Sequence, residues 1–308
     1  MGDPGPLLSL VIPVRGDAFQ LTQLGVACST ALPGVEWIVV VDGDPGGSVT
    51  SALAPLRDRP DVKVVKQERR GPGVARNAGL SHALGATVAF LDSDDEADVS
   101  AFIRLASDMS RHRALVGVLG YEMVRDGEAN SRLEGQIPAA GWQDPWPLLR
   151  RRAGVWRFAF ERDFLLREGV TFPDQSYAED LVFLATVLAS GKPAWGVPAC
   201  GYTYRIHSDA ALTQQRPSAL DVAATLGTLD SALESARSPE QRRVLQSWRA
   251  RIWLRLRRSP ITGDLQPLPR AELLKGLAWS VAWAACNPSH LASFVRSKVD
   301  QRAGRRKR

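Results

Sequence analysis

The chain has 308 residues, of which 44% are hydrophobic and 23% are charged, and its formal net charge at pH 7 is +6. Such a composition is typical of an ordinary globular protein, and the length allows one large domain with an appendage, or two domains. The three cysteines, Cys28, Cys200 and Cys286, are far apart and form no C-x-x-C pair, which argues against both a disulfide framework and a zinc site.

The first part of the chain alternates apolar, β-branched runs with helix-like stretches. We predict helices at residues 19–31, 49–58, 72–84 and 98–112, and strands at 7–14, 35–41, 62–66, 86–91 and 114–119. Pro55 should kink or end the second helix, and Pro72 suits the first turn of the third. Repeated strand–helix units with right-handed crossovers predict a doubly wound, mostly parallel α/β sheet flanked by helices.

After Tyr121 this alternation weakens. We expect strand fragments and loop over residues 127–147, then helices at 162–168 and 178–190 and strands at 155–160, 195–198 and 201–207. The remainder is predicted as helices at 218–236, 239–258, 270–286 and 290–302. The sequence therefore predicts a catalytic α/β domain over residues 1–215 and an all-helical C-terminal extension over 216–308.

Neither a secretory signal nor a bilayer span is expected. The start, Met1 to Pro6, has no basic n-region or apolar stretch, and the least charged window, 276–295, is interrupted by Asn287-Pro288-Ser289-His290. The sequence thus predicts a cytoplasmic protein.

Carboxylates follow three of the apolar runs. Residues 92–96 hold four acids, Asp42 and Asp44 follow the second strand, and Asp17 follows the first. Ligands of an open α/β sheet bind beyond the carboxyl ends of its strands, where a hard divalent cation could neutralise such acids. The alternative is that these acids cap helix N-termini, but one cap does not require four of them.

Two further segments could serve the same crevice. Residues 70–79 combine glycines, which permit close approach, with Arg76, a cation suited to a phosphate or an acidic partner. Glu179 and Asp180 begin a helix with an apolar continuation, and as an isolated pair they could equally be exposed. His207 stands at a predicted strand end, where a hydrogen-bonded histidine is an ordinary finding.

In order and approximate spacing these segments resemble the family 2 inverting glycosyltransferases of the GT-A fold. The resemblance covers roughly residues 7–213 and rests on SLVIPV (9–14), IVVVD (38–42), ARNAG (75–79), FLDSDD (90–95), YAEDLVF (177–183) and YRIH (204–207). It implies a GT-A fold and a nucleotide-sugar donor, a UDP-sugar above all. The loop after Asp42 is rearranged relative to the family pattern. Contacts to the nucleotide base are expected from this loop, so the rearrangement bears on which nucleotide is bound.

The resemblance also implies a role for each matching residue. Asp180, next to Glu179, would be the general base that takes a proton from the acceptor hydroxyl. Mn²⁺ or Mg²⁺ would be held by Asp94, Asp95 and His207 and would neutralise the leaving diphosphate. The residues implied to bind the nucleotide are Pro13, Asp42, Arg76, Asp92 and Ser93.

We therefore expect a metal-dependent, inverting transfer of one sugar to a hydroxyl of a cell-envelope glycan, polymer or lipid-linked acceptor. The alternatives are a degenerate sugar-nucleotide or glycan-binding module and a nucleotidyltransferase. The latter would need a glycine-rich phosphate loop after the first strand, and Val14-Arg15-Gly16-Asp17 supplies little of one. No Q-x-x-R-W element appears, which disfavours a processive synthase.

Basic residues crowd the C-terminal end, and Trp279 and Trp283 lie four apart on one predicted helix face. This helix could lie on an anionic cytoplasmic membrane surface, or it could pack on the core or on a second subunit of a homo-oligomer. Nucleic acid is not an expected partner, because no recognised binding module accompanies the charge.

Overall fold

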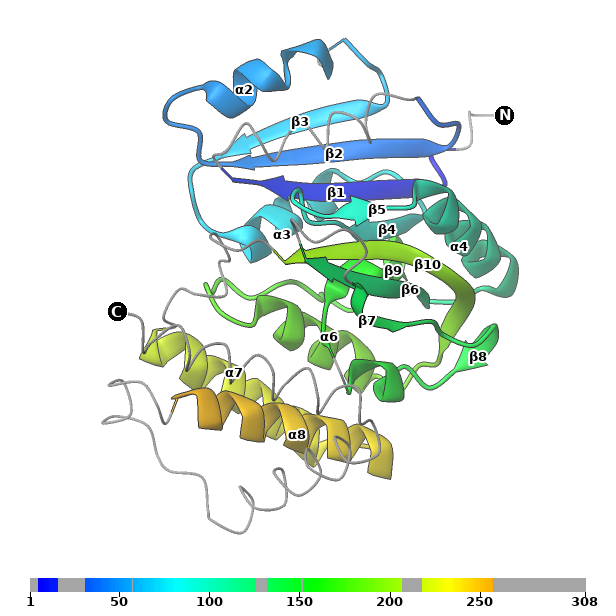
Figure 1. The fold of residues 1–308 in the computed structure, drawn as a ribbon, viewed down its shortest axis with the longest axis vertical. Helices are drawn as coiled ribbons and strands as arrows, with labels where there is room; N and C mark the ends of the chain where they lie inside the picture. Colours follow the sequence, from blue (N-terminus) through cyan, green and yellow to red (C-terminus); the bar gives the residue numbers. More distant parts are fainter. Residues whose placement is uncertain are drawn as a thin grey trace.

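The structure is a computed structural model that describes residues 5–15, 31–56, 58–125, 132–150, 152–206 and 218–256 (Figure 1). The predicted helices at 19–31, 270–286 and 290–302 lie wholly or almost wholly outside these ranges, and so do His207, Trp279 and Trp283.

The described residues form a mixed sheet with the order β3-β2-β1-β4-β9-β6-β10-β5. Its first part is parallel, and consists of β1 (Leu8–Val14), β2 (Val35–Asp42), β3 (Val62–Gln67) and β4 (Thr87–Phe90). β9 (Phe158–Glu161) runs antiparallel between β4 and β6 (Val116–Arg125), and β10 (Ala194–Ile206) is parallel to β6. Short antiparallel strands complete the sheet, namely β5 (Glu96–Ala97), β7 (Arg132–Gln136) and β8 (Gly141–Gln143).

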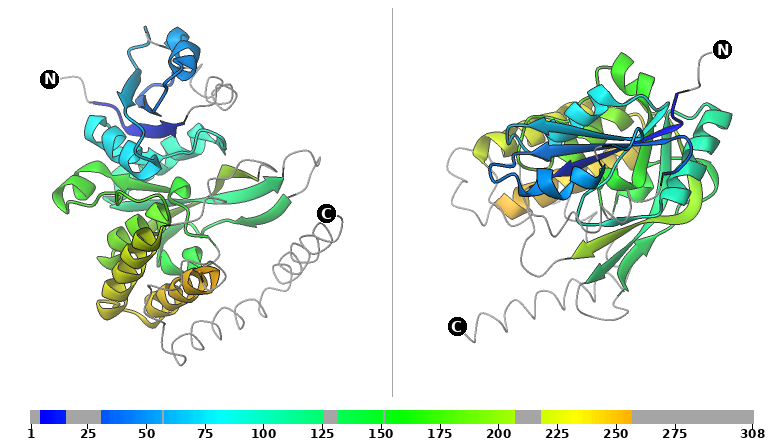
Figure 2. Two further views of the ribbon diagram at one scale, coloured as in Figure 1. Left: turned by 90° about the vertical axis from the view of Figure 1, so that its left-hand side faces the viewer. Right: turned by 90° about the horizontal axis from the view of Figure 1, so that it is seen from above.

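Both faces of this sheet are covered, as its continuous apolar strands require. Side chains alternate along β1, so Val11 joins one apolar cluster while Leu10 and Ile12 join the other. Helices α3 (Pro72–His82) and α6 (Glu179–Ala189) contribute to the first cluster, whereas α2 (Ser48–Ala52) and α4 (Val99–His112) contribute to the second (Figure 2). The predicted mostly parallel sheet flanked by helices is confirmed.

Two prolines explain where the observed elements agree with the predicted ones and where they differ. The helix predicted at 49–58 ends as Pro55 implied, because α2 is followed by a separate turn, η1 (Ala54–Leu56). The two strands predicted at 195–198 and 201–207 are instead the single strand β10. Its register against β6 shifts between Gly196 and Tyr202, around Pro198, which has no N–H to donate to the ladder.

The strand predicted at 155–160 is also partly wrong. Val155–Arg157 is a 3₁₀ turn, η3, and only Phe158–Glu161 pairs as β9. Helix α5 (Arg162–Arg167) follows directly, close to the prediction. The turn brings the backbone before β9 to the start of α6, which matters for the site.

The helices α7 (Ala219–Glu234) and α8 (Pro239–Leu256) pack on the face of the sheet that carries α6. Val222, Leu229 and Trp248 are buried in the same apolar cluster as α6, and the Trp248 indole N–H donates to the Leu149 carbonyl at 3.3 Å. The predicted boundary at 215/216 falls between described ranges and stays a prediction. Within the described ranges, no helix combines the length and the apolar character that crossing a membrane requires.

Candidate active site

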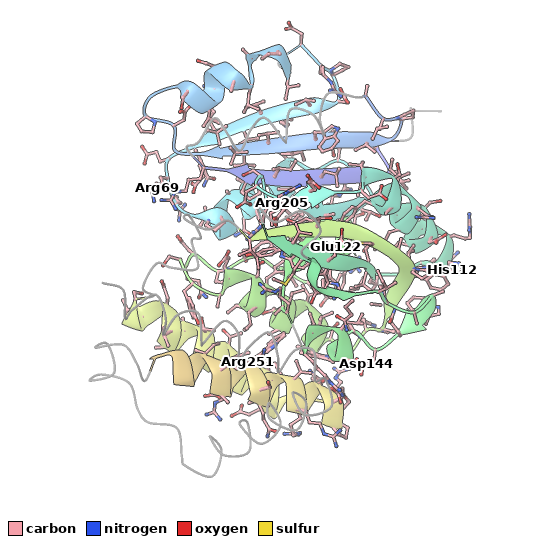
Figure 3. The ribbon with its side chains drawn as sticks, in the orientation of Figure 1. Arg69, His112, Glu122, Asp144, Arg205 and Arg251 are labelled. Carbon is pink, nitrogen blue, oxygen red and sulfur yellow. The ribbon has the colours of Figure 1, made fainter. Side chains whose placement is uncertain are left out.

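Four of the predicted residues, Asp42, Asp92, Asp180 and Arg76, lie at one edge of the sheet, beyond the carboxyl ends of its parallel strands. Asp92 follows β4, Asp42 ends β2, Arg76 lies on α3, and Asp180 is in the first turn of α6. Arg205, near the end of β10, lies on this side of the molecule, whereas His112 lies at the far end of the sheet (Figure 3). The topology thus brings distant segments of the sequence to one edge.

Arg76 is the centre of this site. Its guanidinium donates from Nη1 to Asp180 Oδ1 at 2.8 Å and to Glu179 Oε1 at 3.1 Å, and from Nη2 to Asp92 Oδ1 at 2.7 Å. The Arg76 side chain is only 4% exposed, and it lies 5.3 Å from the centroid of the Phe172 ring. One buried cation therefore joins the acid loop after β4 to the acids that begin α6.

The charges in this cluster shift one another's protonation. Burial raises the pKa of Asp180 to about 7, and Glu179 and Asp92 add to the rise, while Arg76 opposes it. Burial works against the charge of Arg76, but Asp180, Asp92 and Glu179 together hold its pKa above the ordinary value. Asp180 is therefore a carboxylate suited to exchanging a proton near neutral pH.

The start of α6 is shaped around Asp180. Ala178, the residue before the helix, has left-handed backbone angles (φ 57°, ψ 27°), which a residue with a Cβ rarely adopts. Asp180 Oδ2 accepts a bond from the Val155 N–H at 3.4 Å, from the turn η3. Strained backbone of this kind is found at sites where geometry has to be held.

Helix α3 packs closely against residues 172–173 and against β1, through its small residues and Asn77. The Asn77 side chain donates to the Phe172 carbonyl and accepts from the Phe172 N–H, both at 2.8 Å. A Cβ on Gly73 would lie 2.8 Å from the Pro173 carbonyl oxygen, and one on Gly79 would lie 2.2 Å from Val11 Cγ1. These two glycines permit close packing of α3, which places Arg76 between the acids.

Asp42 is buried and holds the chain between β3 and α3. It accepts bonds at 2.8 Å from the Gln67 side chain, the Arg70 N–H and the Gly71 N–H. Gly71, at φ +101°, has no atom within 4 Å of where its Cβ would be. Asp42 therefore orders a backbone segment that borders open space.

The acid loop, residues 92–96, is fastened to β10. Asp95 Oδ2 accepts from the Tyr202 hydroxyl and Asp95 Oδ1 accepts from the Arg205 N–H, both at 2.7 Å. The same Tyr202 oxygen accepts from the Asp92 N–H at 3.2 Å. Burial, together with the nearby Asp92 and Asp94, raises the pKa of Asp95 to about 8. A negative charge on Asp95 is therefore disfavoured as the site stands, and a cation bound nearby would favour it.

These carboxylates suit a hard cation such as Mg²⁺ or Mn²⁺, which prefers oxygen ligands. Within the described ranges, no group of three or more His, Cys, Asp or Glu side chains is arranged to hold a metal ion. A cation that also binds a diphosphate needs only one or two carboxylates, because the phosphates supply the other oxygens. The donor set fits a cation that arrives with a nucleotide.

Several predicted residues thus come together and others do not. Arg76, Asp92, Glu179 and Asp180 share bonds, and Ser93 is buried beside them in the chain. Asp44 instead accepts from the Thr50 N–H at 2.8 Å and caps α2. The roles assigned from the resemblance, including those of Pro13 and His207, stay predictions.

Sequence reasoning missed Tyr202 and Trp156. Both are buried, and their rings stack with centroids 4.5 Å apart and planes at 11°. Tyr202 lies two residues before the YRIH segment, so its place on the last long strand of the predicted core was the available signal. Its bonds to the acid loop depend on the pairing of β5 with β10, which periodicity does not reveal.

The sequence and the fold both resemble known proteins. A family model described as glycosyl transferase family 2 matches residues 11–166. The succinoglycan biosynthesis protein ExoO of Rhizobium meliloti (strain 1021) is 30% identical over 216 residues, which are 66% of this chain and 62% of that protein. The uncharacterized glycosyltransferase YibD of Escherichia coli (strain K12) is 24% identical over 213 residues, 65% of this chain and 62% of that protein. The chain thus aligns with less than two thirds of the length of these relatives.

Solved structures of S. aureus TarS have a similar fold. The complex of TarS residues 1–349 with UDP-GlcNAc has a TM-score of 0.62 and 17% identity, covering 88% of this chain and 79% of that one. The complex with UDP has a TM-score of 0.61 and 18% identity, covering 89% and 80%. At this level of identity the comparison supports the fold.

Proposed function

The chain belongs to glycosyltransferase family 2, and from this premise we propose that it moves a single sugar, with inversion, from a nucleoside-diphosphate donor to an acceptor hydroxyl. One observation carries the proposal, namely that buried Arg76 bonds both to Asp92 of the acid loop and to Asp180 at the start of α6. An inverting transfer needs a base on one side of the anomeric carbon and charge neutralisation on the other, and this bridge supports assigning both to one site.

Asp180 is the proposed general base. The acceptor hydroxyl loses its proton to Asp180 as its oxygen attacks the anomeric carbon, and the bond from that carbon to the diphosphate oxygen breaks. A carboxylate with a pKa of about 7 takes a proton more readily than an ordinary one. Glu179 shares Arg76 with Asp180 and adds negative charge beside it.

Arg76 is proposed to orient these acids rather than to bind the nucleotide directly. All of its hydrogen bonds to the described residues go to carboxylates, and its side chain is 4% exposed. This changes the expectation from the sequence, in which Arg76 would hold the nucleotide. Asp42 would act on the nucleotide side through the 67–71 segment that it orders.

On the donor side, Asp94 is the proposed main carboxylate for Mn²⁺ or Mg²⁺, with Asp95 and His207 as further candidates. When bound, the cation would neutralise the negative charge of the departing diphosphate. Asp94 is partly exposed and lies on the same loop as Asp92 and Asp95. Asp92 and Ser93 would line the nucleotide side of the same loop.

The relatives support a donor and a class of acceptor. TarS has been solved with UDP-GlcNAc, so we propose a UDP-sugar donor. ExoO is named for succinoglycan biosynthesis, so we propose a glycan, polymer or lipid-linked acceptor of the cell envelope. Peripheral membrane contact or subunit contact through Trp279 and Trp283 stays a prediction, because these residues lie outside the described ranges.

The direct test is release of UDP from a panel of UDP-sugars, with and without acceptor polysaccharide, in Mn²⁺ or in EDTA. We expect acceptor-stimulated release that EDTA stops and that Asp180→Asn removes. Asp163→Asn on α5 is the matched control, because Asp163 pairs only with Arg162 among the described charges and is 60% exposed. Donor binding without release in the wild type would instead indicate a binding module.

A further inference from the structure

We propose that Tyr202, braced by Trp156, is a positioning residue that holds the acid loop in register with the base Asp180. This inference rests on the proposed function and adds residues that no motif of the sequence identified. It is carried by a series of contacts separate from those of Arg76.

The Tyr202 hydroxyl makes two hydrogen bonds, both to the acid loop. It donates to Asp95 Oδ2 at 2.7 Å and accepts from the Asp92 N–H at 3.2 Å. The next bond along β10 comes from the Arg205 N–H to Asp95 Oδ1 at 2.7 Å. Asp95 is therefore held at both oxygens by one strand, and the turn containing Asp94 is held at Asp92 and at Asp95.

Trp156 connects Tyr202 to the turn that bonds the proposed base, Asp180. Its ring stacks on Tyr202 with centroids 4.5 Å apart, and its chain neighbour Val155 donates its N–H to Asp180 Oδ2 at 3.4 Å. The turn leaves room for the indole only because residue 154 is glycine, where a Cβ would lie 2.2 Å from the Trp156 ring. Trp156 thus belongs to the same short turn as the backbone partner of Asp180.

Two separate series of contacts connect Asp92 with Asp180. Arg76 joins them directly, and Tyr202, Trp156 and Val155 join them by a second route. A loop held by one contact could pivot about it, whereas a loop held by two separate series of contacts keeps its distance to the base. Inverting transfer depends on such a fixed geometry between attacking and leaving groups.

The Tyr202 hydroxyl is the group that distinguishes a positioning role from simple packing. Tyr202 is 1% exposed, and a phenylalanine would fill the same space and stack equally well on Trp156. A buried hydroxyl is tolerated only with partners, and here both partners belong to the acid loop. Its role is therefore to hold that loop, in the way that outer groups orient metal ligands in other proteins.

The test compares Tyr202→Phe with Tyr204→Phe, in a binding assay that needs no turnover. Tyr204 lies two residues along β10 and also contacts Trp156, at 5.8 Å between centroids, and its hydroxyl makes no hydrogen bond to the acid loop in the described structure. Uptake of Mn²⁺ in the presence of UDP is followed by electron paramagnetic resonance, and the thermal midpoint of each variant is recorded.

We expect Tyr202→Phe to weaken Mn²⁺ uptake by about tenfold to a hundredfold. Tyr204→Phe should stay within about twofold of the wild type. Trp156→Phe, which keeps a smaller ring, should fall between them. Wild-type affinity in Tyr202→Phe, or equal losses in both tyrosine variants, would overturn the inference. No uptake of Mn²⁺ with UDP by the wild type would instead overturn the proposed function itself.

Discussion

Arg76 Nη1 lies 2.8 Å from Asp180 Oδ1, although the two residues are 104 positions apart in the sequence. Because Arg76 is 3% exposed, its charge is compensated almost entirely by Asp180, Glu179 and Asp92 rather than by water. This pair therefore controls both the stability of the site and the protonation of the proposed base.

Replacing Arg76 by methionine should destabilise the protein strongly. The change leaves three partly buried carboxylates without their cation, and breaking such a buried network costs about 3–5 kcal/mol. Arg76→Lys keeps the charge but not the fork that reaches two elements, so it should recover only part of the loss. The free energy of unfolding in urea measures this, with Arg111→Met on α4, 68% exposed, as the control that should change little.

Replacing Asp180 by asparagine should lower the transfer rate by about 10²–10⁴-fold, because asparagine cannot take the acceptor proton. Binding of UDP with Mn²⁺, measured by calorimetry, should remain close to wild type, since Asp180 is proposed to act on the acceptor side. A variant that still transfers sugar at the wild-type rate would contradict the assignment of the base.

The transfer rate should depend on pH through Asp180. The base acts as the carboxylate, so activity should fall as the pH drops through about 7, the raised pKa of Asp180, rather than near 4. Since Arg76 lowers this pKa, Arg76→Lys, which fits the site less well, should move the midpoint to higher pH. A pH profile of kcat in both proteins checks the position and the direction, and an unchanged midpoint would argue that another group titrates.

Removing the cation should stop transfer, and Asp94→Asn should raise the Mn²⁺ concentration needed for half-maximal activity. A carboxamide is a weaker ligand than a carboxylate for a hard cation. The acid loop should keep its conformation, since the substitution leaves in place the bonds that β10 makes to Asp95 and to the Asp92 N–H. Titration of EDTA-treated protein with Mn²⁺ measures the shift, and Asp163→Asn should behave as wild type.

The strands and the acids at their ends were predictable from the sequence for one physical reason. Runs such as 37–41 and 86–91 are apolar on both faces, which only a covered parallel sheet satisfies, and parallel strands end at the same edge. The position of Asp42 and Asp92 at one edge followed from this, whereas that of Asp180, at the start of a helix, was expected only from the family resemblance. Even the end of the helix at Pro55 followed from local chemistry.

What could not be predicted depends on pairing between distant segments. The turn at Val155 replaces the start of a predicted strand, and its N–H reaches Asp180 because β9 inserts antiparallel between β4 and β6. Tyr202 reaches the acid loop because β10 pairs with β5. Likewise, the sequence left open whether Arg76 meets a phosphate or an acidic partner, since nothing local shows that three carboxylates surround it.

The close packing of α3 can be tested apart from the chemistry, with two Gly→Ala substitutions that should change the free energy of unfolding in opposite directions. At Gly79 the new Cβ would lie 2.2 Å from Val11 Cγ1, so α3 must move away from β1, at a cost of about 1–3 kcal/mol. At Gly227, in α7, nothing lies within 4 Å, so alanine should stabilise the helix by about 0.5–1 kcal/mol. Urea unfolding measures both. Because Arg76 is carried by α3, Gly79→Ala should also slow transfer, whereas Gly227→Ala should leave the rate unchanged. A Gly79→Ala protein with full stability and activity would mean that α3 does not need this close contact to place Arg76.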